Sequence, residues 1–404
     1  MNQSSFQGGS LHRKVAAAIA CFIFGFGALW ATKQFLGAGL GDYSGTSAGG
    51  VSAAQVIGAD TESLPPQTDS LMAPGHTWPI ATPLVTTAAP ATASMLESVK
   101  QSPAEPSVTV LMGGDVMLDR HVRLLGMTYG YDSLFAGISD LMKTADISVV
   151  NLEGTITSSP SRTLLADNNT TQELSFTFDP ATAAVLKKSG IDLVSLANNH
   201  ADNFGVQGLR ETQSYLAHAG VGYFGDPWND SGTEKIISKN GITLAFVGYH
   251  AFQGGFDRVI ATVKRLSADG DFVIVMPHWG IEYAALATVD QHARARALAA
   301  AGAGAIIGSH PHVTEDHEWL PAADGSFVPV YYSLGNLLFD QYFSPSVMEG
   351  NIISLTITRN AAGKAKLSGL QVFTTSLATH FGPEIISMPT ADDPPSTVIP
   401  SPSP

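Results

Sequence analysis

The chain has 404 residues, of which 44% are hydrophobic and only 14% are charged, and its formal net charge is −14 at pH 7. A length of this size is typical of two or three domains. The acidic balance argues against duplex nucleic acid as a partner, because binding to phosphates needs clustered Lys and Arg. The single cysteine, Cys21, excludes an intrachain disulfide, a cysteine-ligated zinc site and a CxxC redox pair. Any metal site must therefore use His, Asp, Glu and Asn.

The beginning of the chain predicts a single-pass membrane anchor. Residues 15–32 form an uncharged, mostly apolar run preceded by an Arg-Lys pair. As a helix this run would be about 27 Å long, close to the thickness of a bilayer core. No Lys or Arg follows Lys33 until Lys100, so the positive-inside rule places residues 1–14 in the cytoplasm and the bulk of the chain outside the membrane. A cleaved signal peptide with secretion, or a buried core helix, are the alternatives.

Two segments have compositions that do not favour a packed core. Residues 33–105 are rich in Gly, Ala, Ser, Thr and Pro and show no lasting helical or strand period. Such a composition buries too little apolar surface to offset chain entropy, so we predict a disordered linker. Residues 391–404 have a similar Pro- and Ser-rich character and are predicted to be a disordered tail. The folded domain is expected over residues 106–390.

Residues 106–390 alternate between short apolar runs and helical patterns, which predicts an α/β or layered α+β domain. The apolar, β-branched runs are typical of strands buried on both faces. They lie at 108–114, 147–151, 191–198, 242–248, 272–278, 303–310 and 328–336. Helices are predicted after Asp179-Pro180 and over 208–220 and 290–302, each with a glycine where the helix stops. A late antiparallel hairpin is predicted from 351–360 and 366–376.

Polar residues stand at the ends of six of these runs. They are Gly114-Asp115, Asn151-Leu152-Glu153-Gly154, Asn198-Asn199-His200, His278-Trp279-Gly280, His310-Pro311-His312 and Gly335-Asn336. Open α/β sheets bind ligands outside the carboxyl ends of their strands, so the set predicts a metal site. On an extended X-Pro segment, the side chains of His310 and His312 would point the same way. Each residue also has a structural explanation as a cap, a turn or a core histidine. That explanation is preferred for five other histidines: His121, His218, His250, His292 and His317.

Imidazole, amide and carboxylate ligands suit Mn²⁺, Fe²⁺, Zn²⁺ or Mg²⁺, with one or two ions per chain. Two ions about 3.5–4 Å apart, bridged by a carboxylate, would clamp a displacement at phosphorus and lower the pKa of bound water. A histidine that binds no ion could protonate the leaving group. Hydrolysis of a phosphoester is the predicted reaction, and amide hydrolysis is also chemically allowed. No GxSxG elbow, Walker loop or GxGxxG fingerprint occurs in a supporting context.

Six motifs resemble those of the bacterial CapA (PgsA) family of capsule biosynthesis proteins, which is linked to poly-γ-glutamate synthesis and export. In chain order they are GDVMLDR (114–120), NLEGTIT (151–157), LANNHADNFG (196–205), MPHWGIEY (276–283), IIGSHPHV (306–313) and YSLGNLLFD (332–340). The family is similar to the calcineurin-like metallophosphoesterases, so the resemblance implies a four-layer fold of two sheets flanked by helices. It also implies an N-terminal membrane anchor and an extracytoplasmic domain.

The resemblance further implies roles for single residues. Six of them would bind metal ions: Asp115 and His312 the first ion, Asn199, His278 and His310 the second, and Glu153 both. His200 would be the general acid. Candidates for substrate binding are Asn151, Arg120 and Asn336, although Arg120 could instead pair on a helix face. The usual Asp-x-His pair after the first strand reads Asp115-Val116-Met117 here, so the first ion would lack one histidine ligand.

We therefore expect a membrane-anchored, metal-dependent CapA-type protein that makes, exports or trims an anionic polymer outside the cytoplasmic membrane. The expected partners are the membrane, an anionic polymer or phosphoester substrate, and membrane subunits of a polymer synthase. Two alternatives stay open. One is a non-catalytic accessory subunit of a polymer synthase-export complex, and the other is a general metallophosphoesterase unrelated to capsule.

Overall fold

The computed structural model describes the chain in five segments: residues 106–165, 174–230, 232–322, 324–359 and 362–395. Three predicted parts lie outside these residues, namely the cytoplasmic segment 1–14, the anchor 15–32 and the linker 33–105. Within the five segments, no helix is long and apolar enough to cross a membrane. The structure therefore describes the predicted folded domain.

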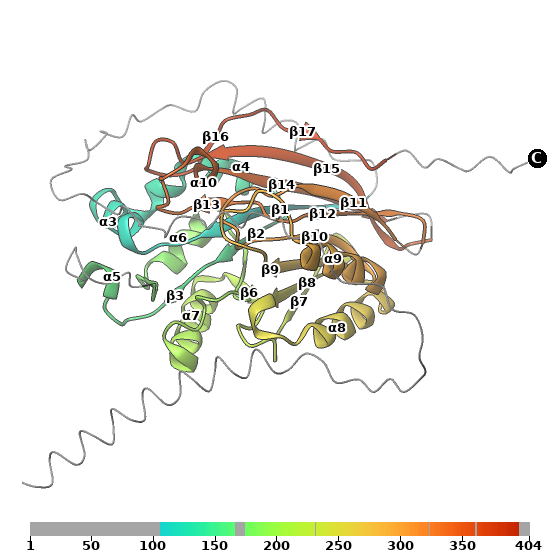
Figure 1. Ribbon diagram of the computed structural model, residues 1–404, viewed down its shortest axis with the longest axis horizontal. Helices are drawn as coiled ribbons and strands as arrows, with labels where there is room; N and C mark the ends of the chain where they lie inside the picture. Colours follow the sequence, from blue (N-terminus) through green and yellow to red (C-terminus); the bar gives the residue numbers. More distant parts are fainter. Residues whose placement is uncertain (1–105, 166–173, 231, 323, 360–361, 396–404) are drawn as a thin grey trace, which may run out of the picture. The chain divides into compact units, whose positions relative to one another are not determined.

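The described strands form two large sheets and one small pair (Figure 1). The first sheet contains, in spatial order, β16 (Glu384–Ile385), β15 (Ala365–Ser376), β14 (Glu349–Arg359), β1 (Ser107–Val116), β2 (Ile147–Leu152), β5 (Leu193–Ser195) and β6 (Gly222–Phe224), with β13 (Asn336–Leu338) on β1 and β17 (Thr390–Ala391) on β15. The second sheet contains β11 (His317–Pro321), β12 (Phe327–Tyr331), β10 (Ala303–Ile307), β9 (Phe272–His278), β8 (Ile242–His250) and β7 (Glu234–Lys239). The small pair is β3 (Thr155–Ile156) with β4 (Thr177–Phe178).

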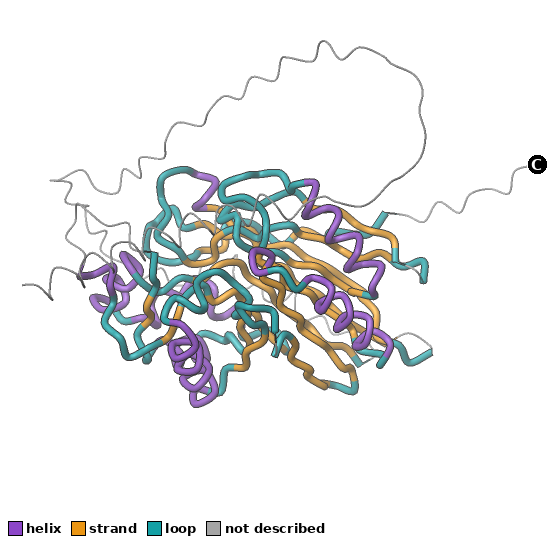
Figure 2. Tube along the Cα trace, turned by 60° about the horizontal axis from the view of Figure 1, so that its bottom comes forward, coloured by secondary structure: helices purple, strands orange, loops and turns teal. Residues whose placement is uncertain are grey.

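The helices lie outside the sheets (Figure 2). The α-helices are α3 (Arg120–Tyr129), α4 (Ala136–Met142), α5 (Arg162–Leu165), α6 (Thr182–Lys188), α7 (Gly205–Ala219), α8 (Phe256–Ala268), α9 (Val289–Ala301) and α10 (Pro345–Met348). Two 3-10 helices, η1 (Tyr131–Phe135) and η2 (Ala251–Gln253), join them among the described residues. Because a helix buries one face, each of the longer helices needs a sheet to pack against.

Alternation of side chains along the strands produces four layers. In β1, Val110 and Met112 enter a core between the sheets that also holds Phe246 of β8, whereas Leu111 points to the opposite face. That opposite face packs against α3, α4, α6 and α7. On the outer face of the second sheet, Val247 of β8 packs against α8 and α9. The predicted arrangement of two sheets flanked by helices is thereby confirmed.

Most predicted elements are present, and the differences occur at their ends. The late hairpin forms as β14 and β15, which pair antiparallel. The apolar runs 191–198 and 303–310 give shorter strands than expected, because the chain leaves the ladder at Ser195 and Ile307 and then carries polar side chains. Helix α6 begins at Thr182 rather than at the predicted Pro180, after a turn in which the Asp179 carboxylate accepts the Ala181 N–H.

The end of the described chain bonds to both large sheets. Strand β17 pairs with β15 of the first sheet, although residues from 391 onward were predicted to be tail. The next residue, Asp392, accepts hydrogen bonds from Trp319 Nε1 at 3.2 Å and from the Tyr331 hydroxyl at 2.6 Å, both in the second sheet. The ordered domain therefore extends past residue 390.

Replacing Asp392 with alanine should lower stability by about 1–3 kcal/mol, because two hydrogen bonds to a carboxylate are lost at a partly exposed site. We expect the thermal unfolding midpoint to fall by several degrees, with a change in Trp319 fluorescence. The neighbouring exposed residue supplies the control, since Asp393→Ala should change neither signal. Equal midpoints for both variants would show that the two hydrogen bonds to Asp392 contribute nothing to stability.

Candidate metal centre

The parallel strands of both sheets bring their carboxyl ends to one place. In the first sheet, Asp115 of β1 pairs with Asn151 of β2, and Asp115 also pairs with Asn336 of β13. In the second sheet, His278 ends β9 and forms a bridge with Ser309, just after β10. Since side chains beyond such strand ends face a common edge, the predicted ligands converge from elements far apart in sequence.

A first group of donor atoms consists of Asp115, Glu153 and His312. One ligand atom from each lies within 4.8 Å of the other two, and all three residues are buried. His312 Nδ1 lies 3.4 Å from Asp115 Oδ2, and His312 Nε2 lies 3.7 Å from Glu153 Oε1. Two carboxylates and one imidazole are a fitting set for a divalent transition ion.

The contacts of Asn336 define which nitrogen of His312 is free to bind. The Asn336 side-chain N–H group donates to the Val347 carbonyl and to Gln341 Oε1, both at 3.0 Å, so its oxygen faces His312. His312 Nδ1 lies 3.0 Å from that oxygen and must therefore carry the proton. In the neutral ring, Nε2 is the lone-pair donor directed at Glu153, as in metal-binding histidines whose second nitrogen is hydrogen-bonded.

A second group of donor atoms consists of Asn199, His278 and His310. His278 Nε2 lies 2.8 Å from Asn199 Oδ1 and 3.2 Å from His310 Nδ1. The His278 and His310 rings are 4.7 Å apart between centroids. Three donor atoms at these separations would fit around a second cation, and they are the residues that the resemblance assigns to it.

Asn151 links the two groups. Its side-chain N–H group donates to Asp115 Oδ1 at 2.8 Å and lies 3.3 Å from His278 Nδ1, and its oxygen accepts from Asn198 at 3.0 Å. Asn198 also donates to the Leu152 carbonyl at 2.9 Å and accepts the backbone N–H of His200. This network is fully buried at Asn151 and Asn198, so it fixes the spacing of the two groups.

The loop that carries two of the histidines has an unusual backbone. His310 has φ +102° and His312 has φ +59°, both in the region that favours glycine. The extended X-Pro geometry predicted from the sequence is therefore wrong. The Asp115 carboxylate accepts the His310 N–H at 3.2 Å, and this contact helps to hold the strained conformation. As a result, His310 faces the second group and His312 the first, and such strain is typical of functional sites.

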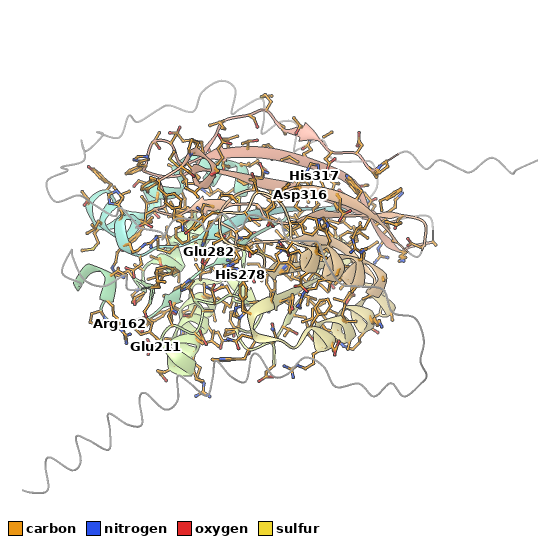
Figure 3. The ribbon with its side chains drawn as sticks, viewed as in Figure 1. Arg162, Glu211, His278, Glu282, Asp316 and His317 are labelled. Atoms are coloured by element: carbon orange, nitrogen blue, oxygen red, sulfur yellow. The ribbon has the colours of Figure 1, made fainter. Side chains whose placement is uncertain are left out.

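The electrostatics of the cluster favour a bound cation. Burial raises the pKa of Glu153 to about 8, and the nearby Asp115 and Glu282 charges add to this rise. Burial disfavours the His312 imidazolium, but Glu153 and Asp115 outweigh that cost and raise the pKa of His312 to about 9. Burial and the neighbouring His310 lower the pKa of His278 well below its usual value, which keeps that imidazole neutral and able to bind an ion. Figure 3 labels His278 at the end of β9 and Glu282 on the loop that follows it.

The strongest indication that a cation fits comes from the two carboxylate oxygens of Glu153. Both of its carboxylate oxygens are buried and have no hydrogen-bond partner among the described residues. A buried carboxylate without a partner is costly, and a divalent ion coordinated by these oxygens would remove that cost. Asp115 and His312 stand where they would share such an ion with Glu153.

His200 lies against the first group. Its Nε2 is 3.8 Å from Glu153 Oε1, and its ring packs on Phe176 with centroids 4.3 Å apart. The Asn203 oxygen accepts the Phe176 backbone N–H and lies 3.2 Å from His200 Nδ1, so Nδ1 carries the proton and Nε2 faces the centre. Burial lowers the pKa of His200 to about 4. The free imidazole is therefore neutral at pH 7.

The three predicted substrate-binding residues differ in access. Arg120 is partly exposed, forms an ion pair with Asp340 and lies over the rings of Phe176 and Phe339 at 5.1 and 5.4 Å. Its positive charge contributes a lowering of the pKa at both Glu153 and His200. Asn151 and Asn336 are instead buried with their polar atoms bonded inside the protein. Their geometry is that of residues that position Asp115 and His312.

Comparison with known proteins identifies the family of the chain. The family described as "Bacterial capsule synthesis protein PGA_cap" matches residues 109–341, more than half of the chain. The chain belongs to this family. Two relatives of this chain come from Bacillus: the PGA biosynthesis protein CapA of Bacillus subtilis (strain 168) is 28% identical over 277 residues, and the capsule biosynthesis protein CapA of Bacillus anthracis is 30% identical over 262 residues. These alignments cover 64% and 58% of this chain, and 70% and 60% of the relatives.

A solved structure shows a weaker likeness. It is a protein from Staphylococcus aureus named as a 5'-nucleotidase, in complex with alpha-ketoglutarate. The TM-score is 0.40 with 12% sequence identity, over 72% of this chain and 56% of that one. A similarity of this size carries no functional conclusion, so the family assignment rests on the sequence match.

Several residues of this site were given no role by sequence reasoning. Asn198 stood in the predicted cluster without a role of its own, and Asn203 lies in the same polar run, whose density of polar residues was the available signal. Phe176 and Ser309 carry no such signal. Ser309 lies 3.1 Å from His278 Nδ1, a contact that exists only through the pairing of β9 with the segment after β10.

The histidines assigned to structural positions are found in varied surroundings. His218 lies exposed on α7 beside the Ser214 carbonyl, and His292 bonds with Glu318. His317 lies on β11 near Asp392, apart from His278 in Figure 3. His250, by contrast, is buried beside the second group, with its ring 6.0 Å from that of His278.

Glu315 is a buried acid that follows His310 and His312 in the chain. Its Oε2 accepts a hydrogen bond from Gln291 at 2.7 Å, but its Oε1 is buried without a partner among the described residues. Burial raises the pKa of Glu315 to about 7. Because the unfolded chain loses this proton near pH 4.5, the folded state is favoured at low pH and loses stability as pH rises toward and through 7.

Glu315→Gln should therefore stabilise the cation-free chain at pH 8.5, by about 1 kcal/mol after allowance for screening, and leave it unchanged at pH 4.5. Urea unfolding in EDTA at the two pH values would measure this. Exposed Glu384 provides the control substitution. A difference between Glu315→Gln and wild type that does not depend on pH would contradict the expectation.

Proposed function

We propose that this chain acts in making, exporting or trimming an anionic capsule polymer, with a two-cation centre of the hydrolase type. The observation that carries the proposal is the convergence of two donor groups. Asp115, Glu153 and His312 form one group, and Asn199 with two histidines forms the other. Membership of the capsule synthesis family connects such a centre with capsule polymer.

In such a centre, some residues of the chain would bind the ions and others would hold those ligands in place. Divalent ions held by the two groups would polarise a phosphoryl or acyl oxygen and lower the pKa of bound water. Glu153 offers two oxygens without hydrogen-bond partners beside Asp115 and His312, and the family resemblance assigns it the bridging position. Asn336 and Asn151 hold His312 and Asp115 in place through hydrogen bonds.

His200 and Arg120 would act on the substrate. Arg120, held by Asp340, supplies a partly exposed positive charge that can bind an anionic group. His200 presents Nε2 toward the centre and is neutral in the free protein. An anionic substrate beside it would raise the pKa of the imidazole and allow it to deliver a proton to the leaving group.

The proposal includes the location of the chain. Residues 15–32 would anchor it in the cytoplasmic membrane with residues 106–395 on the extracytoplasmic side. The apolar run and the lack of Lys and Arg between Lys33 and Lys100 support this arrangement. Membrane subunits of a polymer synthase would then be natural neighbours.

One observation favours a non-catalytic accessory role. At the position of the usual histidine, Met117 is buried and its sulfur accepts the Asp119 N–H at 3.0 Å. The first group therefore has three protein donors among the described residues. A weakly bound first ion would leave a centre that binds polymer without cleaving it.

The deciding experiment combines metal analysis of the purified full-length chain with complementation in cells. We expect at least one transition ion per chain, turnover of a phosphodiester such as bis(p-nitrophenyl) phosphate with Mn²⁺, and a loss of turnover of roughly 10²-fold or more in His200→Asn. Absence of metal in the purified chain would refute the centre. If deletion abolishes polymer but His200→Asn and Asn199→Ala preserve it, the accessory role is correct.

A further inference from the structure

The imidazole of His278 has different neighbours at its two nitrogens. Nε2 lies beside Asn199 and His310 in the second group. Nδ1 lies 3.3 Å from the Asn151 side-chain nitrogen and 3.1 Å from the Ser309 hydroxyl oxygen, and both of these residues are buried. Burial and the neighbouring His310 lower the pKa of His278 well below its usual value, so the ring is neutral and only one of its nitrogens carries a proton. The neighbours of the ring therefore decide which nitrogen can bind a cation.

The Asn151 amide presents its nitrogen, not its oxygen, to His278. That nitrogen also donates to Asp115 Oδ1 at 2.8 Å, and a carboxylate oxygen can only accept. The Asn151 oxygen accepts from the Asn198 nitrogen at 3.0 Å, and the same nitrogen donates to the Leu152 carbonyl at 2.9 Å, which fixes both amides. Since an amide nitrogen can only donate, Asn151 favours a lone pair on His278 Nδ1.

In the cation-free chain the proton of His278 is therefore on Nε2. This nitrogen lies 2.8 Å from Asn199 Oδ1, and because an amide oxygen can only accept, the contact is a hydrogen bond when Nε2 carries the proton. A histidine binds a metal ion through a lone pair, and in this tautomer Nε2 has none to offer. Binding of the second cation at Nε2 therefore requires the proton to be on Nδ1.

Ser309 has a group that can accept a proton from Nδ1. Its hydroxyl oxygen lies 3.1 Å from His278 Nδ1 and 3.3 Å from the Pro277 carbonyl oxygen, and a hydroxyl can donate to one neighbour while it accepts from another. The backbone holds this hydroxyl in place, because the Ser309 N–H donates to the Pro277 carbonyl at 2.9 Å and the Ser309 carbonyl accepts the Trp279 N–H at 3.1 Å. With its own proton directed at the Pro277 carbonyl, Ser309 can accept from Nδ1–H and leave Nε2 with a lone pair.

We propose that Ser309 is a positioning residue of the second cation site, which accepts the proton of His278 Nδ1 and thereby leaves Nε2 free for the ion. The inference rests on the proposed centre and adds the residue that sets the His278 tautomer in the loaded state. On loading, the ring gives up one proton at Nε2 and takes up one at Nδ1, so its charge does not change. Asn151 keeps its bond to Asp115 in both tautomers, so the spacing of the two donor groups is unaffected.

The test uses the full-length chain labelled with ¹⁵N-histidine and the variant Ser309→Ala. Alanine leaves a proton on His278 Nδ1 with the donor nitrogen of Asn151 as its polar neighbour among the described residues, and so without an acceptor there. Titration with Zn²⁺ should show that the second ion, followed at the His310 resonances, binds at least about 10-fold more weakly than in wild type. The first ion, followed at His312, should bind with unchanged affinity.

The matched control is Ser148→Ala. Ser148 is a buried serine like Ser309, but its hydroxyl donates to the Met142 carbonyl at 2.6 Å near the start of β2. Both substitutions remove one buried hydroxyl and its hydrogen bond, so both should lower stability. Only Ser309→Ala should change the affinity for the second ion, which separates the loss of a proton acceptor from a general loss of stability.

A measurement on the wild-type chain does not depend on the fold of the variant. The ¹⁵N resonances of His278 should show a proton on Nε2 in the cation-free chain and on Nδ1 after Zn²⁺ is added. A proton that stays on one nitrogen throughout the titration, or wild-type affinity for the second ion in folded Ser309→Ala, would overturn the inference while leaving the centre intact. If Zn²⁺ shifted neither the His278 nor the His310 resonances of the wild-type chain, the second position of the proposed centre would itself be overturned.

Discussion

Replacing Glu153 with glutamine is expected to abolish tight binding of divalent cations and, at the same time, to stabilise the cation-free chain. Both effects come from the same carboxylate, which is fully buried and has neither oxygen hydrogen-bonded among the described residues. A neutral amide removes the cost of burying that charge, which we estimate at about 1–3 kcal/mol. It also removes the ligand that lies beside Asp115 and His312. An ordinary structural acid would show destabilisation on substitution.

The stabilisation by Glu153→Gln should depend on pH. Burial raises the pKa of Glu153 to about 8 in the folded chain, so stability is lost between about pH 4.5 and 8 as the unfolded chain ionises first. The pKa of His312 is raised to about 9, because Glu153 and Asp115 outweigh the effect of burial, so its contribution is lost between about pH 6.5 and 9. Both groups thus weaken the cation-free wild type as pH rises. Glu153→Gln should unfold at a higher temperature than wild type at pH 9 and at an equal temperature at pH 4.5.

Thermal unfolding with EDTA and with added Mn²⁺ would measure both effects. An ion at about 100 times its Kd should stabilise wild type by about 2.7 kcal/mol and leave Glu153→Gln unchanged. Glu282→Gln is the control, because it removes an equal charge from an exposed loop near the centre. A variant that binds Mn²⁺ like wild type, or that is less stable than wild type at pH 9, would contradict the role given to Glu153.

Sequence reasoning predicted that these residues come together because the relevant information is local. A buried strand is readable as an apolar run, and the polar residue at its end is readable in the same window, as for Asp115 near the end of β1 and His278 at the end of β9. Parallel pairing then forces such ends to one edge. This is why ligands separated by more than 150 positions could be predicted together from the sequence alone.

The remaining features depend on tertiary contacts that no local window contains. The X-Pro rule predicts an extended His310, yet the structure gives φ +102°, with the His310 N–H bonded to Asp115. His250 was predicted to be structural because its context was interpreted as helical or surface, whereas it is the buried last residue of β8. Its free Nε2 becomes visible only when the Pro227 carbonyl is found at Nδ1. In both cases a partner distant in sequence decides the outcome.

Replacing Asn151 with leucine should damage both cation positions at once, because this amide bonds to Asp115 and Asn198 and lies beside His278. Leucine has nearly the same size but leaves the buried Asp115 Oδ1 without its hydrogen bond. We expect a loss of about 2–4 kcal/mol, or a fall of roughly 4–16 °C in the unfolding midpoint. Titration calorimetry should show weaker binding of both ions.

The control for Asn151→Leu is Asn351→Leu, a half-buried asparagine on β14 of the same sheet, which should cost much less. If Asn151→Leu lowered stability while both ions still bound with wild-type affinity, the Asn151 amide would contribute to stability and not to ion binding. Weakening of one ion with the other unchanged would mean that the two groups are positioned separately. Joint weakening is expected because Asp115, Asn151 and His278 form a continuous set of buried contacts, so a shift of the central residue moves a donor on each side.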